Sequence, residues 1–310
     1  MEKIGEIYFK FYNKKMIVAA YRKYIPKKHR DVIYYFILKD ILFFIRNFKT
    51  IIKSKFSYWF RFIIPQSLTN EAFVFMGKYG ICLLPYNFTL KYKNLNITQY
   101  RDEFNQLPYV IHYNKKLYFP REFNPADIDK NYKQLLAEQD EASAHRYVNH
   151  WIELSGKTLL DIGASEGIIS LNVIEIVDQV ILFENDENWI EALSATFAPY
   201  KNKVTIVKKF ISNVNDDCNL TIDYFLNGKM IDNLFIKMDI EGSEYNALQG
   251  ATKILNDSKN IQLSVCTYHR KDDFKNISNF LFKKGLYCDF SEGYVFLDNE
   301  FRKGVIRAKR

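Results

Sequence analysis

A glycine-containing turn and an acidic residue beyond it have the types and spacing of a nucleoside-binding site. The segment Asp161-Ile-Gly163-Ala-Ser165-Glu-Gly167 follows an apolar run, and its glycines allow a tight turn and the close approach of a ligand. Glu184 ends the next apolar run, 23 residues after Asp161. An acid about 20 residues after the turn hydrogen-bonds ribose hydroxyls in doubly wound folds. The two features together predict a site for the ribose of an adenosine.

The glycine spacing distinguishes two candidate cofactors. GxxxG lacks the third glycine of the GxGxxG turn that holds a dinucleotide pyrophosphate. S-adenosylmethionine has no pyrophosphate, and its positive sulfonium favours the carboxylates that Asp161, Glu184 and Asp239 supply. An NAD(P)-dependent Rossmann oxidoreductase is the alternative, but Tyr268-His-Arg-Lys271 has the wrong spacing for the YxxxK pair of such an enzyme. S-adenosylmethionine is therefore the predicted cofactor.

A longer run around Asp239 carries a family resemblance. Residues 235–251, FIKMDIEGSEYNALQGA, resemble the signature of the FkbM family of S-adenosylmethionine-dependent methyltransferases. The segments TLLDIGASEG, FEND and LTIDYF are similar to other motifs of that family, and the resemblance extends roughly from residue 138 to the C-terminus. It implies methyl transfer to a hydroxyl, commonly on a sugar or a natural product. The segments EQDEASAHRYV and GVIRAKR also look like members from bacterial polysaccharide gene clusters.

The resemblance also implies contacts for the cofactor. By matching position, the first motif would hold the methionine end, Glu184 the ribose, and Asn185 and Ser212 the adenine side, with Asp239 beside the sulfonium. The predicted cofactor-binding residues are Asp161, Gly163, Ala164, Ser165, Gly167, Glu184, Asn185, Ser212 and Asp239.

A hydroxyl is a poor nucleophile at neutral pH, so methyl transfer needs a positioned base. The predicted catalytic residues are Asp239, Glu241 and His269, and Glu244 is a further candidate. His269 follows a predicted strand, and imidazole titrates near neutral pH, but a single histidine is as often structural. Glu241 and Glu244 begin a helix, where the dipole alone favours acids.

No metal site is predicted. Asp239 and Glu241 could begin a site for a divalent ion, but the sequence offers no third ligand. His145 and His150 are five residues apart, which fits no ligand spacing, and they are left unassigned. The four cysteines, Cys82, Cys218, Cys266 and Cys288, are far apart without a CxxC pair, which predicts reduced, buried thiols and an intracellular protein.

Composition and charge exclude several classes of protein. The 310 residues are 48% hydrophobic and 26% charged, which argues against a disordered chain. The net charge of +8 is concentrated at one end, since residues 1–70 hold 15 Lys or Arg against 4 Asp or Glu and the remainder is slightly acidic. A basic surface for nucleic acid across the whole protein is therefore not predicted.

The N-terminal part contains a predicted basic amphipathic helix that ends near Pro65. Its apolar core, residues 32–45, is interrupted by Lys39 and Asp40 and is shorter than the ~20 residues that span a bilayer. No export signal is evident. Residues 31–62 could lie in the interface of an anionic membrane, pack on the catalytic domain or contact RNA. One helical stripe is polar: Lys39, Arg46, Thr50, Lys53, Ser57 and Arg61.

The pattern of the remaining chain predicts the elements that position the site. Short apolar runs broken by turns predict a β-meander over residues 71–123, and Pro125 opens a helix. From Thr158 onward strand-like and helix-like segments alternate, which predicts a doubly wound, Rossmann-like class I methyltransferase sheet of the α/β class. The expected parts are residues 1–70, a helical extension; 71–137, a β-rich substrate or lid region; and 138–310, the methyltransferase domain.

Ligands of such sheets lie at the carboxyl ends of the strands. The predicted site therefore follows Asp161, Glu184, Phe210, Asp239 and Tyr268. The sequence thus predicts a cytoplasmic O-methyltransferase that acts on a glycan or glycolipid acceptor in polysaccharide biosynthesis. A peripheral position at the inner face of the membrane is one of the alternatives that residues 31–62 leave open. The alternatives are the oxidoreductase and a non-catalytic, membrane-associated adaptor built on a decayed methyltransferase fold. No oligomeric state is predicted.

Overall fold

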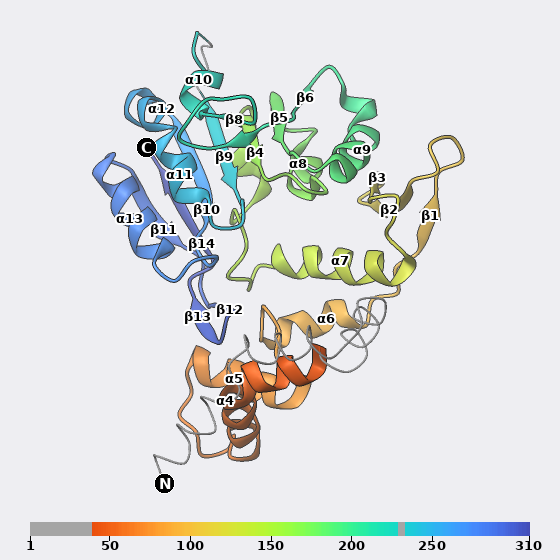
Figure 1. Ribbon diagram of the computed structural model, residues 1–310, viewed down its shortest axis with the longest axis vertical. Helices are drawn as coiled ribbons and strands as arrows, with labels where there is room; N and C mark the ends of the chain where they lie inside the picture. Colours follow the sequence, from red (N-terminus) through yellow and green to blue (C-terminus); the bar gives the residue numbers. More distant parts are fainter. Residues whose placement is uncertain (1–38, 229–232) are drawn as a thin grey trace, which may run out of the picture. The chain divides into compact units, whose positions relative to one another are not determined.

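A computed structural model describes residues 39–228 and 233–310 (Figure 1). The chain divides into two compact units, one formed by residues 1–66 and 70–81 and the other by residues 67–69 and 82–310. The start of the predicted amphipathic helix, residues 31–38, lies outside the described residues. Among the described helices, none is both long enough and apolar enough to cross a bilayer.

The described part of the first unit consists of two helices, α4 (Lys39–Trp59) and α5 (Leu68–Tyr79). Helix α4 agrees with the predicted helix, but α5 contradicts the predicted meander, because the run FVFM is helical rather than extended. Ala72, Phe73 and Met76 recur at helical spacing and are buried. Gly77 brings the helices together, since a Cβ there would lie 2.1 Å from the carbonyl oxygen of Ser54.

The second unit is built on a seven-stranded sheet with the order β11-β14-β10-β9-β4-β5-β6. The strands that are parallel to one another are β4 (Thr158–Ile162), β5 (Gln179–Phe183), β6 (Val204–Val207), β9 (Leu234–Met238) and β10 (Ile261–Cys266). Strand β14 (Val305–Lys309) is antiparallel and lies between β10 and β11 (Tyr287–Phe290). This sheet confirms the predicted doubly wound class.

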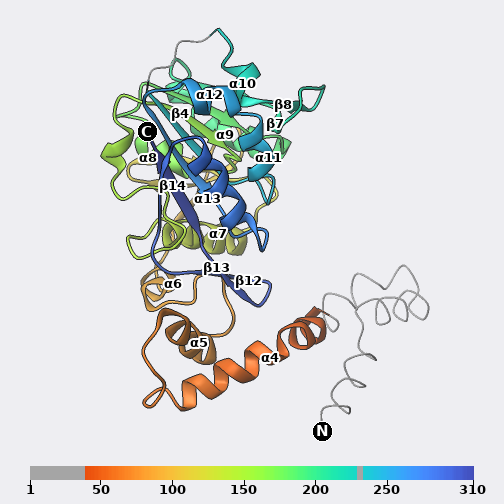
Figure 2. The same cartoon turned by 90° about the vertical axis from the view of Figure 1, so that its left-hand side faces the viewer.

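Helices cover both faces of this sheet (Figure 2). Successive residues of a strand contribute to opposite cores: Leu159 of β4 packs in one, and Leu160 packs in the other. The first core includes α8 (Ile168–Val173) and α9 (Glu187–Thr196). The second includes α10 (Ile222–Phe225), α11 (Glu244–Gln249), α12 (Thr252–Asp257) and α13 (Asp273–Lys283).

Smaller elements precede and decorate the sheet. A three-stranded antiparallel meander, predicted from the sequence, is formed by β1 (Gln99–Arg101), β2 (Pro108–His112) and β3 (Lys115–Tyr118). It leads into α7 (Pro125–Glu138), whose first turn is capped by the side chain of Asn124. The other short elements are η2 (Asn87–Thr89), α6 (Leu90–Lys93), η3 (Trp151–Leu154), η4 (Ala198–Tyr200), β7 (Phe210–Ile211), β8 (Asn219–Leu220), β12 (Val295–Leu297) and β13 (Glu300–Arg302).

The connections create a point where the order of the parallel strands reverses. From β4 the chain builds outward to β5 and β6, then returns to place β9 on the other side of β4. The chain after β4 leads to α8 on one face of the sheet and the chain after β9 leads to α11 on the other, which leaves room for a ligand at this edge. The prediction of buried thiols is only partly correct: Cys266 is buried, Cys82 and Cys288 are half-buried, and Cys218 is exposed because it lies in the turn before β8.

Candidate active site

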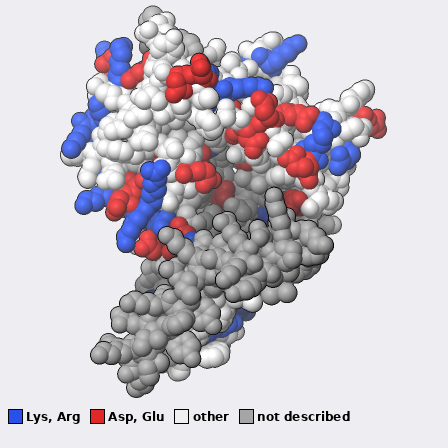
Figure 3. All heavy atoms as spheres, in the orientation of Figure 1, with Lys and Arg blue, Asp and Glu red and all other residues white. Residues whose placement is uncertain are grey.

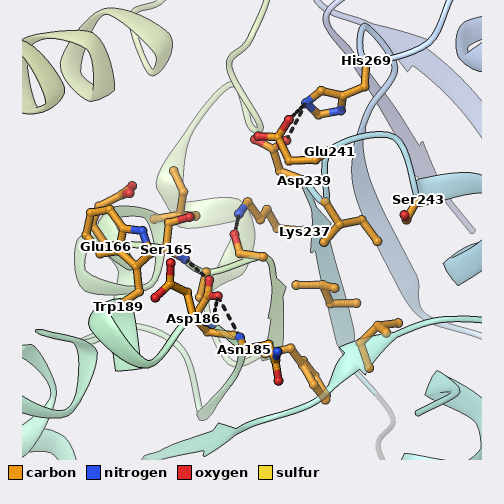
Figure 4. A pocket seen from close by; sticks show the side chains of 18 of the residues that line it. Ser165, Glu166, Asn185, Asp186, Trp189, Lys237, Asp239, Glu241, Ser243 and His269 are labelled. Atoms are coloured by element: carbon orange, nitrogen blue, oxygen red, sulfur yellow. Dashed lines mark hydrogen bonds and ion pairs between the residues drawn. The ribbon is translucent and has the colours of Figure 1, made fainter. Parts of the chain in front are cut away.

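A pocket of about 860 Å³ opens at the carboxyl ends of β4, β5, β9 and β10. Its volume is within the ~300–1,000 Å³ typical of sites for small ligands. Figure 4 shows Ser165, Glu166, Asn185, Asp186 and Trp189 near one end and Asp239, Glu241 and His269 near the other. Residues of α7, including Asn131, Gln134 and Glu138, complete the wall.

The loop after β4 is held against the end of β5 by Glu184. The backbone N–H of Ser165 donates to Oε2 of Glu184 over 2.9 Å, and the N–H groups of Asn185 and Asp186 donate to Oε1 over 2.7 and 2.9 Å. Ser165 itself has a φ of 46°, a left-handed conformation that is uncommon for a residue with a side chain. Glu184 therefore fixes the shape of the loop as well as facing the pocket.

Gly163 is required where the loops after β4 and β9 touch. Its φ is 74°, and a Cβ at this position would lie 1.9 Å from the carbonyl oxygen of Asp239. Only glycine permits both the conformation and the approach. Gly163 thus determines how near the predicted ribose side of the pocket lies to Asp239.

Asp161 and Gly167 do not line the pocket, contrary to the contacts predicted for them. Asp161 is 1% exposed, accepts a hydrogen bond from Ser170 and forms an ion pair with Nζ of Lys237 over 3.0 Å. Gly167 has a φ of 73° and precedes α8, with a Cβ there meeting Leu193 at 2.8 Å. Both residues support the loop from behind rather than facing the ligand space.

Lys237 connects the two halves of the site from beneath. Its Nζ also donates to the carbonyl oxygen of Gly163 over 2.6 Å. Burial by itself lowers the pKa of Lys237, but the charges of Asp161 and Asp239 outweigh it and raise that pKa above its ordinary value. Lys237 is therefore a permanent cation under the pocket floor.

Asp239 is surrounded by hydrogen-bond donors and cations. The hydroxyl of Tyr147 donates to Oδ2 over 2.8 Å, and Nε2 of His145 lies 3.5 Å from the same oxygen. Burial opposes ionisation, but His145, Lys237 and His269 hold the pKa of Asp239 well below its usual range. A carboxylate so stabilised is a weak base and a suitable counter-charge for a cation.

His269 lies between two carboxylates. Its Nδ1 is 2.9 Å from Oε1 of Glu244, and its Nε2 is 3.4 Å from Oδ1 of Asp239. Glu244 is fully buried, and its Oε1 also accepts from the N–H groups of Ile240 and Gly242. Burial lowers the pKa of His269, but Glu244 and Asp239 outweigh it and raise that pKa. Glu244 thus holds the imidazole so that Nε2 faces the pocket.

Glu241 has a different setting from the other acids of this loop. Its side chain is 93% exposed, with Oε2 3.8 Å from Nε2 of His269 (Figure 4). Its φ of 55° places a left-handed residue next to Gly242, whose φ is 92°. Glu241 therefore projects into solvent, whereas the side chain of His269 is 7% exposed and enclosed at the end of the pocket.

Two groups of side chains in the described part of the chain have the composition of metal ligands. They are His145 with Asp239 and Cys266, and Asp239 with Glu244 and His269, with the ligand atoms of each group within 4.8 Å of one another. Glu241, the predicted partner of Asp239, belongs to neither group. Oε1 of Glu244 already receives three donors.

Acidic residues dominate the charged lining. The acidic side chains are Glu138, Glu166, Glu184, Asp186, Asp239 and Glu241, against the amines of Lys209 and Lys237 and the imidazoles of His145 and His269. Burial raises the pKa of Glu166 to about 8, so this carboxyl keeps its proton at neutral pH. The face of the second unit in Figure 3 likewise carries acidic and basic groups side by side rather than a basic field.

The lining fits S-adenosylmethionine in its chemistry. Asp239 offers a negative charge for a sulfonium, and the Glu184 carboxylate lies at the end of the neighbouring strand, where a ribose is expected. Gly163, Ala164, Ser165, Asn185 and Ser212 line the same pocket, so the structure brings them together with Glu184 and Asp239. Their contacts with the cofactor remain predictions.

The sequence did not identify several groups of this site. Sequence analysis gave Tyr147 no role and left His145 unassigned, yet both contact Asp239. They come from the irregular segment before β4, so no strand pattern could place them. Lys237 offered a usable signal, because a single charge inside an otherwise apolar parallel strand requires a buried partner.

Comparisons with known proteins identify a family. The model of the methyltransferase FkbM domain matches residues 96–294, a span that begins before the predicted start at residue 138 and includes the meander and α7. No curated protein matches the chain.

Solved structures were also compared. Methyltransferase FkbM from Methylobacillus flagellatus KT is 20% identical, with 60% of each chain covered and a TM-score of 0.40. Magnesium protoporphyrin IX methyltransferase from Synechocystis PCC 6803, with bound SAM, is 12% identical over 61% of this chain and 86% of that one, with a TM-score of 0.40. The chain thus spans 60% of the Methylobacillus protein's length.

Proposed function

Because the chain belongs to the FkbM methyltransferase domain family, whose cofactor is S-adenosylmethionine, we propose that it transfers a methyl group to a hydroxyl of a sugar or glycolipid precursor in polysaccharide biosynthesis. The observation that carries this proposal is the placement of His269. Its Nε2 faces the pocket beside Asp239, while Glu244 holds Nδ1. This is the arrangement of a general base with a carboxylate that orients it.

The groups near His269 have separate roles in the proposed reaction. S-adenosylmethionine, when bound, supplies an electrophilic methyl group. Asp239, ionised at neutral pH, provides the counter-charge for a cation, and Tyr147 fixes the direction of its Oδ2. Neutral His269 would accept the proton of the acceptor hydroxyl at Nε2, and Glu244 would stabilise the imidazolium that results. Only the fraction of the protein with neutral His269 would be active.

The lining also favours a particular class of acceptor. Its carboxylates would repel phosphate and carboxylate groups close to the transfer site, whereas they accept hydrogen bonds from hydroxyls. Asn131 and Gln134 on α7 add amide groups that can donate and accept. A neutral polyol such as a sugar ring is compatible with these lining side chains, and any charged part of a precursor would lie outside the pocket.

The first experiment is a thermal-shift titration of the full chain with S-adenosylhomocysteine, NAD and NADP in parallel. A ligand at 100 times its dissociation constant stabilises a native site by ~2.7 kcal/mol. We expect a shift with S-adenosylhomocysteine alone. A shift with NAD or NADP alone would favour the oxidoreductase, and none with any ligand would favour the non-catalytic adaptor.

The second experiment tests transfer with methyl-labelled S-adenosylmethionine and a panel of neutral oligosaccharides and extracted glycolipids. Products are digested and the methyl position is assigned by mass spectrometry. Methyl ethers that depend on His269 support the proposal, whereas labelled amines or methyl esters would contradict it. His269→Asn removes the base, and His150→Asn is the matched control, because His150 is exposed and does not line the pocket.

A further inference from the structure

Helix α4 is amphipathic in the reverse sense to an ordinary surface helix. Between residues 40 and 59 its buried side chains are small and polar: Asn47, Thr50, Ser54 and Ser57. Six large apolar side chains along one face are exposed by 46–69%: Ile41, Phe44, Phe48, Ile52, Phe56 and Trp59, here called the apolar stripe. Phe43 is also exposed, and Leu42, Ile45 and Ile51 are half-buried. Burial of apolar surface normally sets the opposite pattern.

The polar side of α4 is the one that packs against α5. A Cβ on Gly77 would lie 2.1 Å from the carbonyl oxygen of Ser54 and 2.6 Å from the Cβ of Tyr58. Nζ of Lys55 donates to the carbonyl oxygen of Gly77 over 2.8 Å, and Nζ of Lys53 lies 4.0 Å from the ring centre of Phe73. Packing within this unit therefore leaves the apolar stripe uncovered by α5.

The shape of the apolar stripe suits a flat partner. Its residues follow one another at steps of three, four, four, four and three, which at 3.6 residues per turn spreads them over about 120° of the helix surface. A coiled-coil partner would require a narrow seam with a repeat of 3.5 residues. A broad face of four aromatic rings along a 21-residue helix matches the surface of a bilayer better than a groove.

Charge identifies the type of surface. Residues 39–61 contain six Lys or Arg and one Asp. On the helix, Lys49 borders the apolar stripe on one side, Lys55 lies within its arc, and Arg61 follows it with its guanidinium 4.3 Å from the ring centre of Phe62. Basic side chains beside aromatic ones bind anionic lipid surfaces, at about 1 kcal/mol for each Lys or Arg near the headgroups.

We propose that α4 lies in the interface of an anionic membrane, with the apolar stripe in the acyl boundary and α5 on the side away from the lipid. This proposal does not depend on methyl transfer. It selects one of the three interpretations of this helix, because the face that packs on α5 is not the apolar stripe. Exposed apolar surface of this extent on a single helix needs a partner, and a bilayer accommodates it without a complementary groove.

The test is flotation of the full chain with vesicles of phosphatidylcholine alone or mixed with phosphatidylglycerol. The variant Phe48→Ser/Ile52→Ser/Phe56→Ser removes the middle of the apolar stripe. The matched control, Phe104→Ser/Tyr113→Ser/Ile152→Ser, removes exposed apolar residues from the second unit. We expect binding to anionic vesicles, at least tenfold weaker for the first variant, unchanged for the control and reduced by salt.

A second measurement keeps the proposal testable if the variant misfolds. Brominated lipids quench a tryptophan that enters the acyl region, so the wild type should lose more fluorescence than Trp59→Phe. Equal quenching in these proteins would contradict the proposal. A second contradicting result would be a wild-type dimer in sedimentation that Phe48→Ser/Ile52→Ser/Phe56→Ser no longer forms, together with no binding to vesicles. The apolar stripe would then join two copies of the chain.

Discussion

Replacement of Lys237 by methionine should strongly destabilise the second unit. The side chain keeps a similar length and loses its charge, which leaves Asp161 buried without its cation. Lys237 and Asp161 are 5% and 1% exposed, and their charged atoms are 3.0 Å apart. Removal of one member of such a pair costs ~3–5 kcal/mol of unfolding free energy. For a domain of this size that corresponds to about 6–20 °C in melting temperature.

Urea denaturation and thermal melting of the wild type and of Lys237→Met measure this difference. Lys253→Met is the control, because Lys253 pairs with Asp257 at the surface, 74% and 61% exposed, and that pair contributes only ~0.3–0.5 kcal/mol. Adding Asp161→Asn to Lys237→Met should restore most of the lost unfolding free energy, because it removes the uncompensated charge of Asp161. A loss below about 1 kcal/mol for Lys237→Met would refute the reasoning from buried charge.

Three further predictions concern the pocket. Glu184→Ala should weaken binding of S-adenosylhomocysteine by at least ~1 kcal/mol. The loss should exceed that of Glu184→Gln, which keeps one oxygen as an acceptor for the backbone N–H groups. Unchanged affinity in calorimetry would show that Glu184 does not bind the ribose. Glu166 keeps its proton in the folded chain up to about pH 8 but not in the unfolded chain. The unfolding free energy should therefore fall by up to about 1.4 kcal/mol per pH unit between pH 5 and 8, and Glu166→Gln should flatten this slope in denaturation at pH 6 and 8. Activity should rise with pH as His269 loses its proton. Glu244→Gln should move that rise about one pH unit lower, because it removes a carboxylate that stabilises the imidazolium by ~1.4 kcal/mol. A pH profile of activity that does not move would exclude His269 as the base.

The alternation of strands and helices after Thr158 was enough to predict the sheet, because each buried parallel strand is a short, continuous apolar run. The same rule failed at FVFM. Four apolar residues fit a strand or a buried helix equally well, and the close approach of Gly77 to Ser54 is a tertiary contact that no local pattern records.

The site was predicted as far as it lies at strand ends. Glu184, Asp239 and His269 follow strands, so their meeting is a consequence of the topology. Tyr147 and His145 reach Asp239 from an irregular segment. Glu244 reaches His269 because the turn before it contains Glu241 in a left-handed conformation. Such contacts depend on where a loop folds back in space, which the spacing of residues does not contain.

The placement of β14 has a consequence for how the sheet is completed. In the described part of the chain, β11 pairs with β14, which follows it in the sequence and lies between it and β10. Until β14 docks, β11 has no neighbouring strand, and the edge of β10 that β14 covers is unpaired. An unpaired strand edge can pair with other chains. Docking of β14 therefore closes the edge of the five parallel strands as well as adding a strand to them.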